Sequence, residues 1–204
     1  TGAFLASSDK VHITFRGKGG HGALPHHAVD PSLPAAATVL ALQSIVARNV
    51  DPLQSAVVTV GRLQAGHTYN VIPETAELEL SVRALAPEVR DLLERRIAEV
   101  ARGQAASFGT SCEVVYERGY PVLVNTEAET RLASRVARAL LGDQQVTEDA
   151  TPLCASEDFA YMLQQRPGCY LMIGNGANGY HQGQPSGPCS VHNPHFDFND
   201  QCLG

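Results

Sequence analysis

The chain has 204 residues, of which 15 are basic and 21 acidic, giving a formal net charge of −6. A nucleic-acid or anionic-membrane partner favours a basic surface, so this balance argues against both. Five cysteines without a CxxC spacing indicate neither a disulfide framework nor a cysteine zinc site, and we expect a reducing cytoplasm. No apolar run approaches the roughly 20 residues that a membrane span requires.

The first part of the chain begins with a strand and a helix. Apolar and polar residues alternate at 11–16, which predicts a half-buried strand. The glycine-rich loop GKGGHG follows at 17–22, and a helix is expected from about Ser32 to Val50, introduced by Asp30-Pro31. That helix is apolar on nearly every side, so we expect a second copy of the domain, or a neighbouring domain, to cover it.

Further elements complete a unit at 8–118. Strands are expected at about 55–63 and 76–83, then a helix from Pro87 with one apolar stripe, then a strand near 112–116. The order βαββαβ predicts a split βαβ, or ferredoxin-like, fold. In this fold the third strand lies antiparallel between the first two. The loop with His21 should therefore lie beside the turn with Asn70, and Arg83 should lie at the far end of the third strand.

Residues 119–204 show a different pattern. Helices are expected at 127–141 and from Ser156 to Gln165, and a buried strand at 168–173. Two helices and at most two strands do not close an α/β domain, so this region with residues 1–7 is expected to be part of a larger domain. The first residues, TGAFLASS, resemble neither a signal peptide nor a natural start, and we interpret them as a cut end.

Two histidine positions are candidates for chemistry. His21, in its glycine-rich loop, is suited to donate a hydrogen bond to an oxyanion, although an exposed loop histidine is the simpler explanation. His192 and His195 flank a proline, and neutral imidazole is a common zinc ligand, but a polar surface loop explains the spacing equally well. His26 and His27 are adjacent in sequence, so we expect their side chains to diverge and do not expect joint chelation.

Three polar positions also have structural explanations. Asparagine is favoured in turns such as the one that holds Asn70, and Arg83 is an outward-facing strand residue that a strand glutamate could pair. Ser156 and Glu157 are typical of a helix start. None of these positions indicates a function by itself.

In combination, four motifs resemble one enzyme family. GKGGHGALPHHAVDP, YNVIPETAELELSVRA, SEDFAYM and CSVHNPHFDFND are similar to motifs of the hippurate hydrolase branch of the metal-dependent amidohydrolases and aminoacylases, and they span residues 17–200 in the family order. The resemblance implies a ferredoxin-like lid, or dimerisation, domain at 8–118. It further implies that 1–7 and 119–204 are part of an α/β zinc-peptidase-type catalytic domain whose N-terminal half is missing.

The same resemblance implies an activity and its cofactors. Relatives hydrolyse N-acyl amino acids with two divalent metal ions, which could be zinc, manganese, cobalt or nickel. His192 matches the last metal ligand, and His21 matches the lid histidine that stabilises the tetrahedral intermediate. Asn70 and Arg83 match residues that hold the substrate's amide or carboxylate end. Most metal ligands are expected to be absent from this chain, which should be inactive alone.

The resemblance leaves some features open. Ser156 and Glu157 match a segment that lines the cleft but receive no role, and Cys154-Ala155 stands where relatives usually carry glycine. We expect a homodimer through the lid, in which Arg83 serves its own subunit's site while His21 and Asn70 reach into the partner's. The alternative is a non-catalytic ferredoxin-like dimerisation or small-ligand-binding module. It explains the first 120 residues equally well but not the loop around His192.

Overall fold

The computed structural model describes residues 1–174 and 196. It contains two compact units, Thr1–Cys169 and Tyr170–Gly204. No helix within the described residues is long and apolar enough to cross a membrane. All the elements named below belong to the first unit.

The first unit is built on a four-stranded antiparallel sheet in the order β4-β6-β2-β7. The strands are β2 (Asp9–Arg16), β4 (Ala56–Ala65), β6 (Thr75–Ala84) and β7 (Ser111–Arg118). Along β2 and β6 buried residues alternate with more exposed ones, as the period of two in a strand requires. The strand order confirms the ferredoxin-like fold, with β6 antiparallel between β2 and β4.

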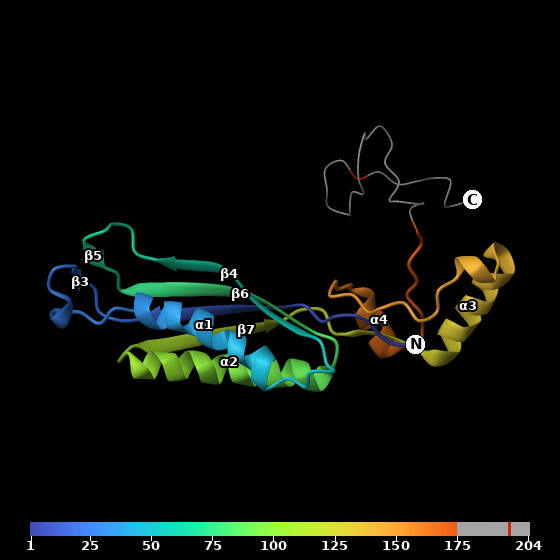
Figure 1. Cartoon of the computed structure of the whole chain (residues 1–204), viewed down its shortest axis with the longest axis horizontal. Helices are drawn as coiled ribbons and strands as arrows, with labels where there is room; N and C mark the ends of the chain where they lie inside the picture. Colours follow the sequence, from blue (N-terminus) through green and yellow to red (C-terminus); the bar gives the residue numbers. More distant parts are fainter. Residues whose placement is uncertain (175–195, 197–204) are drawn as a thin grey trace. The chain divides into compact units, whose positions relative to one another are not determined.

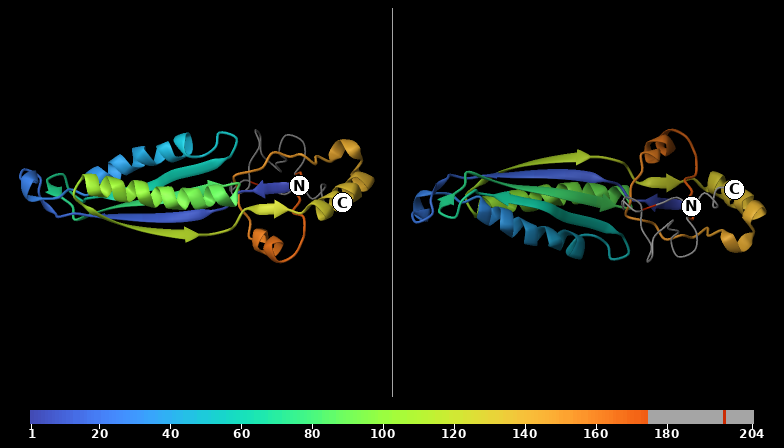
Figure 2. Two further views of the ribbon diagram at one scale, coloured as in Figure 1. Left: turned by 90° about the horizontal axis from the view of Figure 1, so that it is seen from below. Right: turned by 90° about the horizontal axis from the view of Figure 1, so that it is seen from above.

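Two helices, α1 (Ser32–Arg48) and α2 (Pro87–Ser107), cover one face of this sheet (Figures 1 and 2). Asp30 accepts a hydrogen bond from the backbone N–H of Ser32 at 2.8 Å and so stabilises the start of α1. Proline suits the start of α2 because the N–H groups of the first turn have no acceptor within the helix. The N–H that proline lacks is therefore not missed there.

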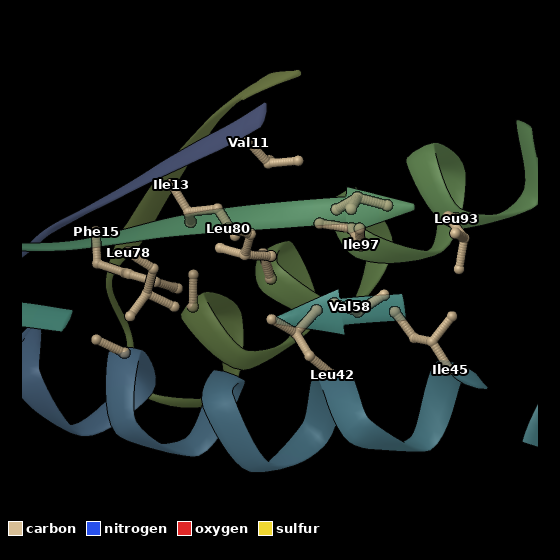
Figure 3. Close-up of a cluster of buried hydrophobic side chains, with 14 of the residues drawn as sticks. Val11, Ile13, Phe15, Leu42, Ile45, Val58, Leu78, Leu80, Leu93 and Ile97 are labelled. Atoms are coloured by element: carbon tan, nitrogen blue, oxygen red, sulfur yellow. The ribbon is translucent and has the colours of Figure 1, made fainter. Parts of the chain in front are cut away.

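The hydrophobic core lies between the helices and the sheet (Figure 3). Phe15 and Leu78 come from the sheet, Leu42 from α1, and Leu93 and Ile97 from α2, and each is fully buried. Burying a side chain of this size contributes about 1.5–3 kcal/mol. The part of the unit from β2 to β7, called the lid below, therefore closes a core of its own.

Short strand pairs lie at the two ends of the large sheet (Figure 1). One pair joins β3 (Gly20–His21) to β5 (Val71–Ile72), beside the short 3₁₀ helix η1 (Pro25–His27). The other joins β1 (Gly2–Leu5) to β8 (Leu123–Asn125). The first pair brings the glycine-rich loop against the turn before β6, and the second belongs to the part of the chain outside the lid.

The region after the lid contains α3 (Glu127–Leu141), the short η2 (Asp143–Gln145) and α4 (Phe159–Gln165). The first of these helices has the predicted bounds. The prediction that the last helix begins at Ser156 is wrong, because Asp158 occupies the N-cap position and Ser156 hydrogen-bonds to the lid instead.

The buried strand predicted at 168–173 is also wrong. The backbone of Gly168 hydrogen-bonds to Thr126, immediately after β8, but the described residues 169–174 form no strand. Leu171, Met172 and Ile173 are 56%, 55% and 72% exposed. A strand requires a hydrogen-bonding neighbour, and residues 168–173 adopt no strand in the described part of the chain.

Candidate functional site

The loop of His21 and the turn of Asn70 are joined by backbone contacts at one end of the sheet. His21 pairs with Val71, and the N–H of Gly22 donates to the carbonyl oxygen of Asn70 at 2.8 Å. A Cβ atom on Gly22 would lie only 3.0 Å from that oxygen, so the close approach of the two backbones favours glycine. The topology therefore brings His21 beside Asn70, as the sequence predicts.

The ring of His21 has a defined hydrogen-bonding polarity. Its Nδ1 atom accepts a hydrogen bond from the backbone N–H of Ala23 at 3.0 Å. A ring nitrogen that accepts carries no hydrogen, so in the neutral imidazole the hydrogen is on Nε2. The side chain is exposed. This geometry suits His21 to donate a hydrogen bond from Nε2 to a group outside the loop.

Exposed apolar side chains are close in sequence to these two polar residues at the end of the sheet. Leu24, Tyr69 and Val71 are 48%, 99% and 51% exposed, and each is close in sequence to His21 or Asn70. Asn70 is exposed as well, and its Oδ1 accepts from the hydroxyl of Thr68 at 3.4 Å. The lid tip, meaning residues 21–27 and 67–72, thus presents both polar groups and apolar surface.

Arg83 lies at the opposite end of the sheet. It is in the last residues of β6, a strand of ten residues, which spans about 33 Å at the usual rise of a strand. Its Nη1 donates to the hydroxyl oxygen of Ser156 at 2.9 Å. A small ligand bound at Arg83 therefore cannot contact His21 and Asn70 of the same subunit.

The simpler explanation of Arg83, a pairing with a strand glutamate, does not hold for Glu77 and Glu79 of its own strand. Glu77 and Glu79 pair with Arg62 of β4, at 3.3 and 2.7 Å. The hydrogen bond from Arg62 lowers the pKa of Glu79. The guanidinium of Arg83 instead donates to Ser156, in the segment that precedes α4.

The proposed metal ligand His192 lies outside the described residues. Within the described part of the chain, no group of three or more His, Cys, Asp or Glu side chains is arranged to hold a metal ion. The described residues therefore do not fit a metal centre by themselves, and the chemistry they can supply is hydrogen bonding and charge at the two ends of the sheet.

A buried polar cluster at the base of the lid was missed from the sequence. The carboxylate of Asp9 is fully buried and accepts from Nε and Nη2 of Arg90, from the hydroxyl of Tyr116 at 2.8 Å and from the N–H of Gly119 at 3.1 Å. Burial, and then the hydrogen bond to Asp9, raises the pKa of Tyr116. Asp9 precedes Val11, Ile13 and Phe15 at the same spacing of two. This spacing places Asp9 on the buried face of the strand, and it could have indicated a buried carboxylate that needs partners.

Comparison with known proteins identifies the family to which the fold belongs. A family model described as a peptidase dimerisation domain, of the M20 type, matches residues 6–108. The chain belongs to this family.

Relatives extend the similarity over the whole chain. It is 38% identical to hippurate hydrolase of Campylobacter jejuni over 202 residues, 99% of this chain and 50% of that protein. It is 41% identical to N-acetyl-L-cysteine deacetylase of Bacillus subtilis over 203 residues, 100% of this chain and 46% of that protein. The chain thus spans about half the length of these curated relatives.

Solved structures agree with these relatives. A dinuclear metal-binding peptidase of the M20 family from Bacillus subtilis superposes with a TM-score of 0.73 at 29% identity, covering 99% of this chain and 47% of that one. A structure described as an aminohydrolase from methicillin-resistant Staphylococcus aureus gives a TM-score of 0.71 at 31% identity, covering 82% of this chain and 43% of that one.

Proposed function

We propose that this chain forms the lid and part of the catalytic domain of a metal-dependent amidohydrolase acting on N-acyl amino acids. The observation that carries the proposal is the hydrogen bond from Arg83 to Ser156. This bond supports the proposal because it brings a cation of β6 against the segment before α4, and such a cation is suited to bind a substrate carboxylate. The relatives named hippurate hydrolase and N-acetyl-L-cysteine deacetylase support this substrate class.

Arg83 binds the carboxylate of the amino-acid part of the substrate. A guanidinium has five N–H donors in a planar fork, and the hydroxyl of Ser156 accepts from Nη1. The other N–H groups of the guanidinium are suited to donate charge-assisted hydrogen bonds to a carboxylate, and such bonds are stronger than neutral ones. Ser156 then acts as the neighbour that orients this fork.

His21 and Asn70 act in the site of the partner subunit. The imidazole donates from Nε2 to the oxygen that becomes negatively charged when the amide carbonyl is attacked, and Asn70 holds the amide end of the substrate. Donors of this kind typically accelerate a reaction about 10²–10³-fold. Since Arg83 lies a full strand length away from both residues, one complete site requires two subunits.

The metal ions are not assigned to described residues. We propose that two divalent ions are held by a part of the protein that corresponds to the relatives' remaining length, together with His192. The described residues supply no ligand set of their own. The contributions derived for Arg83, His21 and Asn70 therefore do not depend on which metal is bound.

The outer face of α1 is the proposed dimer surface. Leu33 and Leu40 on this face are 54% and 76% exposed, and the helix packs beside the edge strand β4. The name of the matching family model refers to dimerisation. In contrast, the exposed side chains of α2 are mostly charged or polar, as on a solvated helix.

A subunit-mixing experiment in the longer protein that contains this chain tests the shared site. His21→Ala and Arg83→Met variants are purified separately, then mixed under conditions of subunit exchange. We expect activity well above either parent, because each mixed dimer has one site with both Arg83 and the partner's His21. The matched control mixes His21→Ala with the double variant, which restores no site. No gain, despite exchange shown by differently tagged subunits, would contradict sharing between subunits.

A non-catalytic dimerisation module is the second candidate. The closed core of the lid favours it. It predicts that neither this chain nor the longer protein binds metal or hydrolyses N-acyl amino acids.

A further inference from the structure

We propose that Asp9, Arg90 and Tyr116 form a positioning cluster that fixes Arg83 at the base of the lid. The inference rests on the proposed function only in assigning Arg83 to a substrate carboxylate. Arg83 touches the ligand, whereas the three cluster residues act through the backbone that carries it.

The cluster joins the two chain segments that connect the lid to the rest of the unit. The first connection, residues 6–9, ends at Asp9, and the second, 118–120, contains Gly119. The N–H of Gly119 donates to Asp9, and its carbonyl oxygen accepts from Arg90 at 3.0 Å. The N–H of Ser8 donates to the carbonyl oxygen of Tyr120, also at 3.0 Å. Both connections are thus fixed to one buried carboxylate.

Close packing leaves these connections little freedom. A Cβ atom on Gly119 would lie 2.3 Å from the carbonyl oxygen of Ser8, so any larger residue there would push the two segments apart. The side chain of Asp9 is 0% exposed and that of Arg90 is 10% exposed. A buried, directional ion pair with extra donors is better suited to fixing geometry than to adding stability, since apolar pairs of similar volume stabilise as well.

The first connection sets the position of the Arg83 backbone. Asp9 is the register partner of Val82, the residue before Arg83. On the other side, the N–H of Ser7 donates to the carbonyl oxygen of Ala84 at 2.8 Å, and the N–H of Ala84 donates to the hydroxyl of Ser7 at 3.2 Å. Both neighbours of Arg83 are therefore attached to the segment that Asp9 anchors.

The same connection holds the partner of Arg83. The N–H of Ala6 donates to the carbonyl oxygen of Leu153, and the N–H of Leu153 donates to that of Phe4, both at 3.0 Å. Ser156 follows three residues later and accepts from Arg83. Arg83 and Ser156 are thus positioned from one short stretch of chain, and a shift of that stretch would separate them.

Tyr116→Phe is the variant that tests the cluster, because it removes one donor to Asp9 and keeps the ring. Tyr120→Phe is the matched control, since it removes a hydroxyl from the second connection but none from Asp9. Arg90→Lys, which keeps the charge, is the second variant if Tyr116→Phe does not fold. All are made in the longer protein. The Arg83 Nε–H signal is followed by ¹⁵N-arginine NMR and assigned through its loss in Arg83→Met.

Kinetics are measured with an N-acyl amino acid and with its C-terminal amide, which lacks the carboxylate. In Tyr116→Phe we expect a broadened or shifted Arg83 signal and a KM raised roughly 3- to 10-fold for the acid only, with kcat nearly unchanged. Adding Tyr116→Phe to Arg83→Met should then raise the KM for the acid no further. Tyr120→Phe should resemble the unmodified protein in each measurement.

Two results overturn the inference: an Arg83 signal in Tyr116→Phe that matches the unmodified protein, or equal losses for acid and amide when Arg83→Met distinguishes them. A different result separates it from the proposed function. If Tyr116→Phe changes the Arg83 signal but Arg83→Met treats acid and amide alike, the positioning cluster stands and the carboxylate role of Arg83 fails.

Discussion

The lid and the region after it, 119–169, differ in how they bury their apolar side chains. In the lid, helix residues such as Leu42 and Leu93 are fully buried against the sheet. In α3, Leu132, Val136 and Leu140 form one stripe but are 51%, 49% and 78% exposed. A stripe at this spacing belongs against a neighbour. The comparison teaches that the lid completes its core within the described residues, whereas the apolar stripe of α3 is left exposed there.

Separating the two regions should give the largest difference. We expect residues 8–118 alone to unfold cooperatively in urea, because their core is complete. Residues 119–174 alone should give no cooperative transition, since too little apolar surface is buried to offset chain entropy. Circular dichroism in a urea titration measures both. A cooperative transition in the second piece would break the comparison.

Removing a buried ion-pair partner in the lid should be the next largest effect. Arg90→Met leaves the carboxylate of Asp9 buried with fewer donors, and we expect it to lower the free energy of unfolding by about 3–5 kcal/mol. The matched change Arg138→Met removes an arginine of α3 whose side chain is 35% exposed and which pairs with Asp143 and Glu148, both after that helix. That change should cost at most about 1 kcal/mol. Equal losses in chemical denaturation would contradict the contrast.

Leucine truncation compares the two regions with one chemical change. Leu42→Ala in α1 empties a fully buried position and should lower the free energy of unfolding by about 2–5 kcal/mol. Leu140→Ala in α3, where the side chain is 78% exposed, should change it by no more than about 0.5 kcal/mol. A large loss at Leu140 in this chain would mean that the stripe is already covered.

Cysteine reactivity gives the smallest expected effect. Burial raises the pKa of Cys112 in the lid to about 11, while Cys154 in the second region is exposed. Because only the thiolate reacts, Cys112 should be alkylated slowly at pH 8.5, and its rate should rise as the pH approaches 11. Peptide-resolved mass spectrometry after iodoacetamide treatment measures each site. Fast alkylation of Cys112 at pH 8.5 that is unchanged in urea would show that it is not protected.

Local periodicity and topology were readable from the sequence. The alternation at 11–16 and the stripe of the helix at 127–141 are set by neighbours along the chain, and the structure has both elements. The fold then placed His21 beside Asn70, because a split βαβ order fixes which strand ends meet. The sequence therefore predicted the features that depend on short-range pattern or on the small number of possible topologies.

Contacts between distant segments were not readable. Ser156 has the sequence context of a helix cap, yet its hydroxyl accepts from Arg83, 73 positions away. Arg90 pairs with Asp9 across 81 positions, and no sequence pattern in either segment predicts this pairing. The apolar run at 168–173 suggested a strand because a sequence pattern describes only the side chains of the segment itself. It does not show whether a neighbouring strand is present to hydrogen-bond with it. The role of His192 stays a prediction.

The most direct test of the account is to measure metal content and N-acyl amino acid hydrolysis for this chain and for the longer protein that contains it. The account predicts bound divalent metal and hydrolysis in the longer protein, and no hydrolysis by this chain alone. Neither metal nor hydrolysis in the longer protein would contradict the amidohydrolase assignment and leave a dimerising, ligand-binding module.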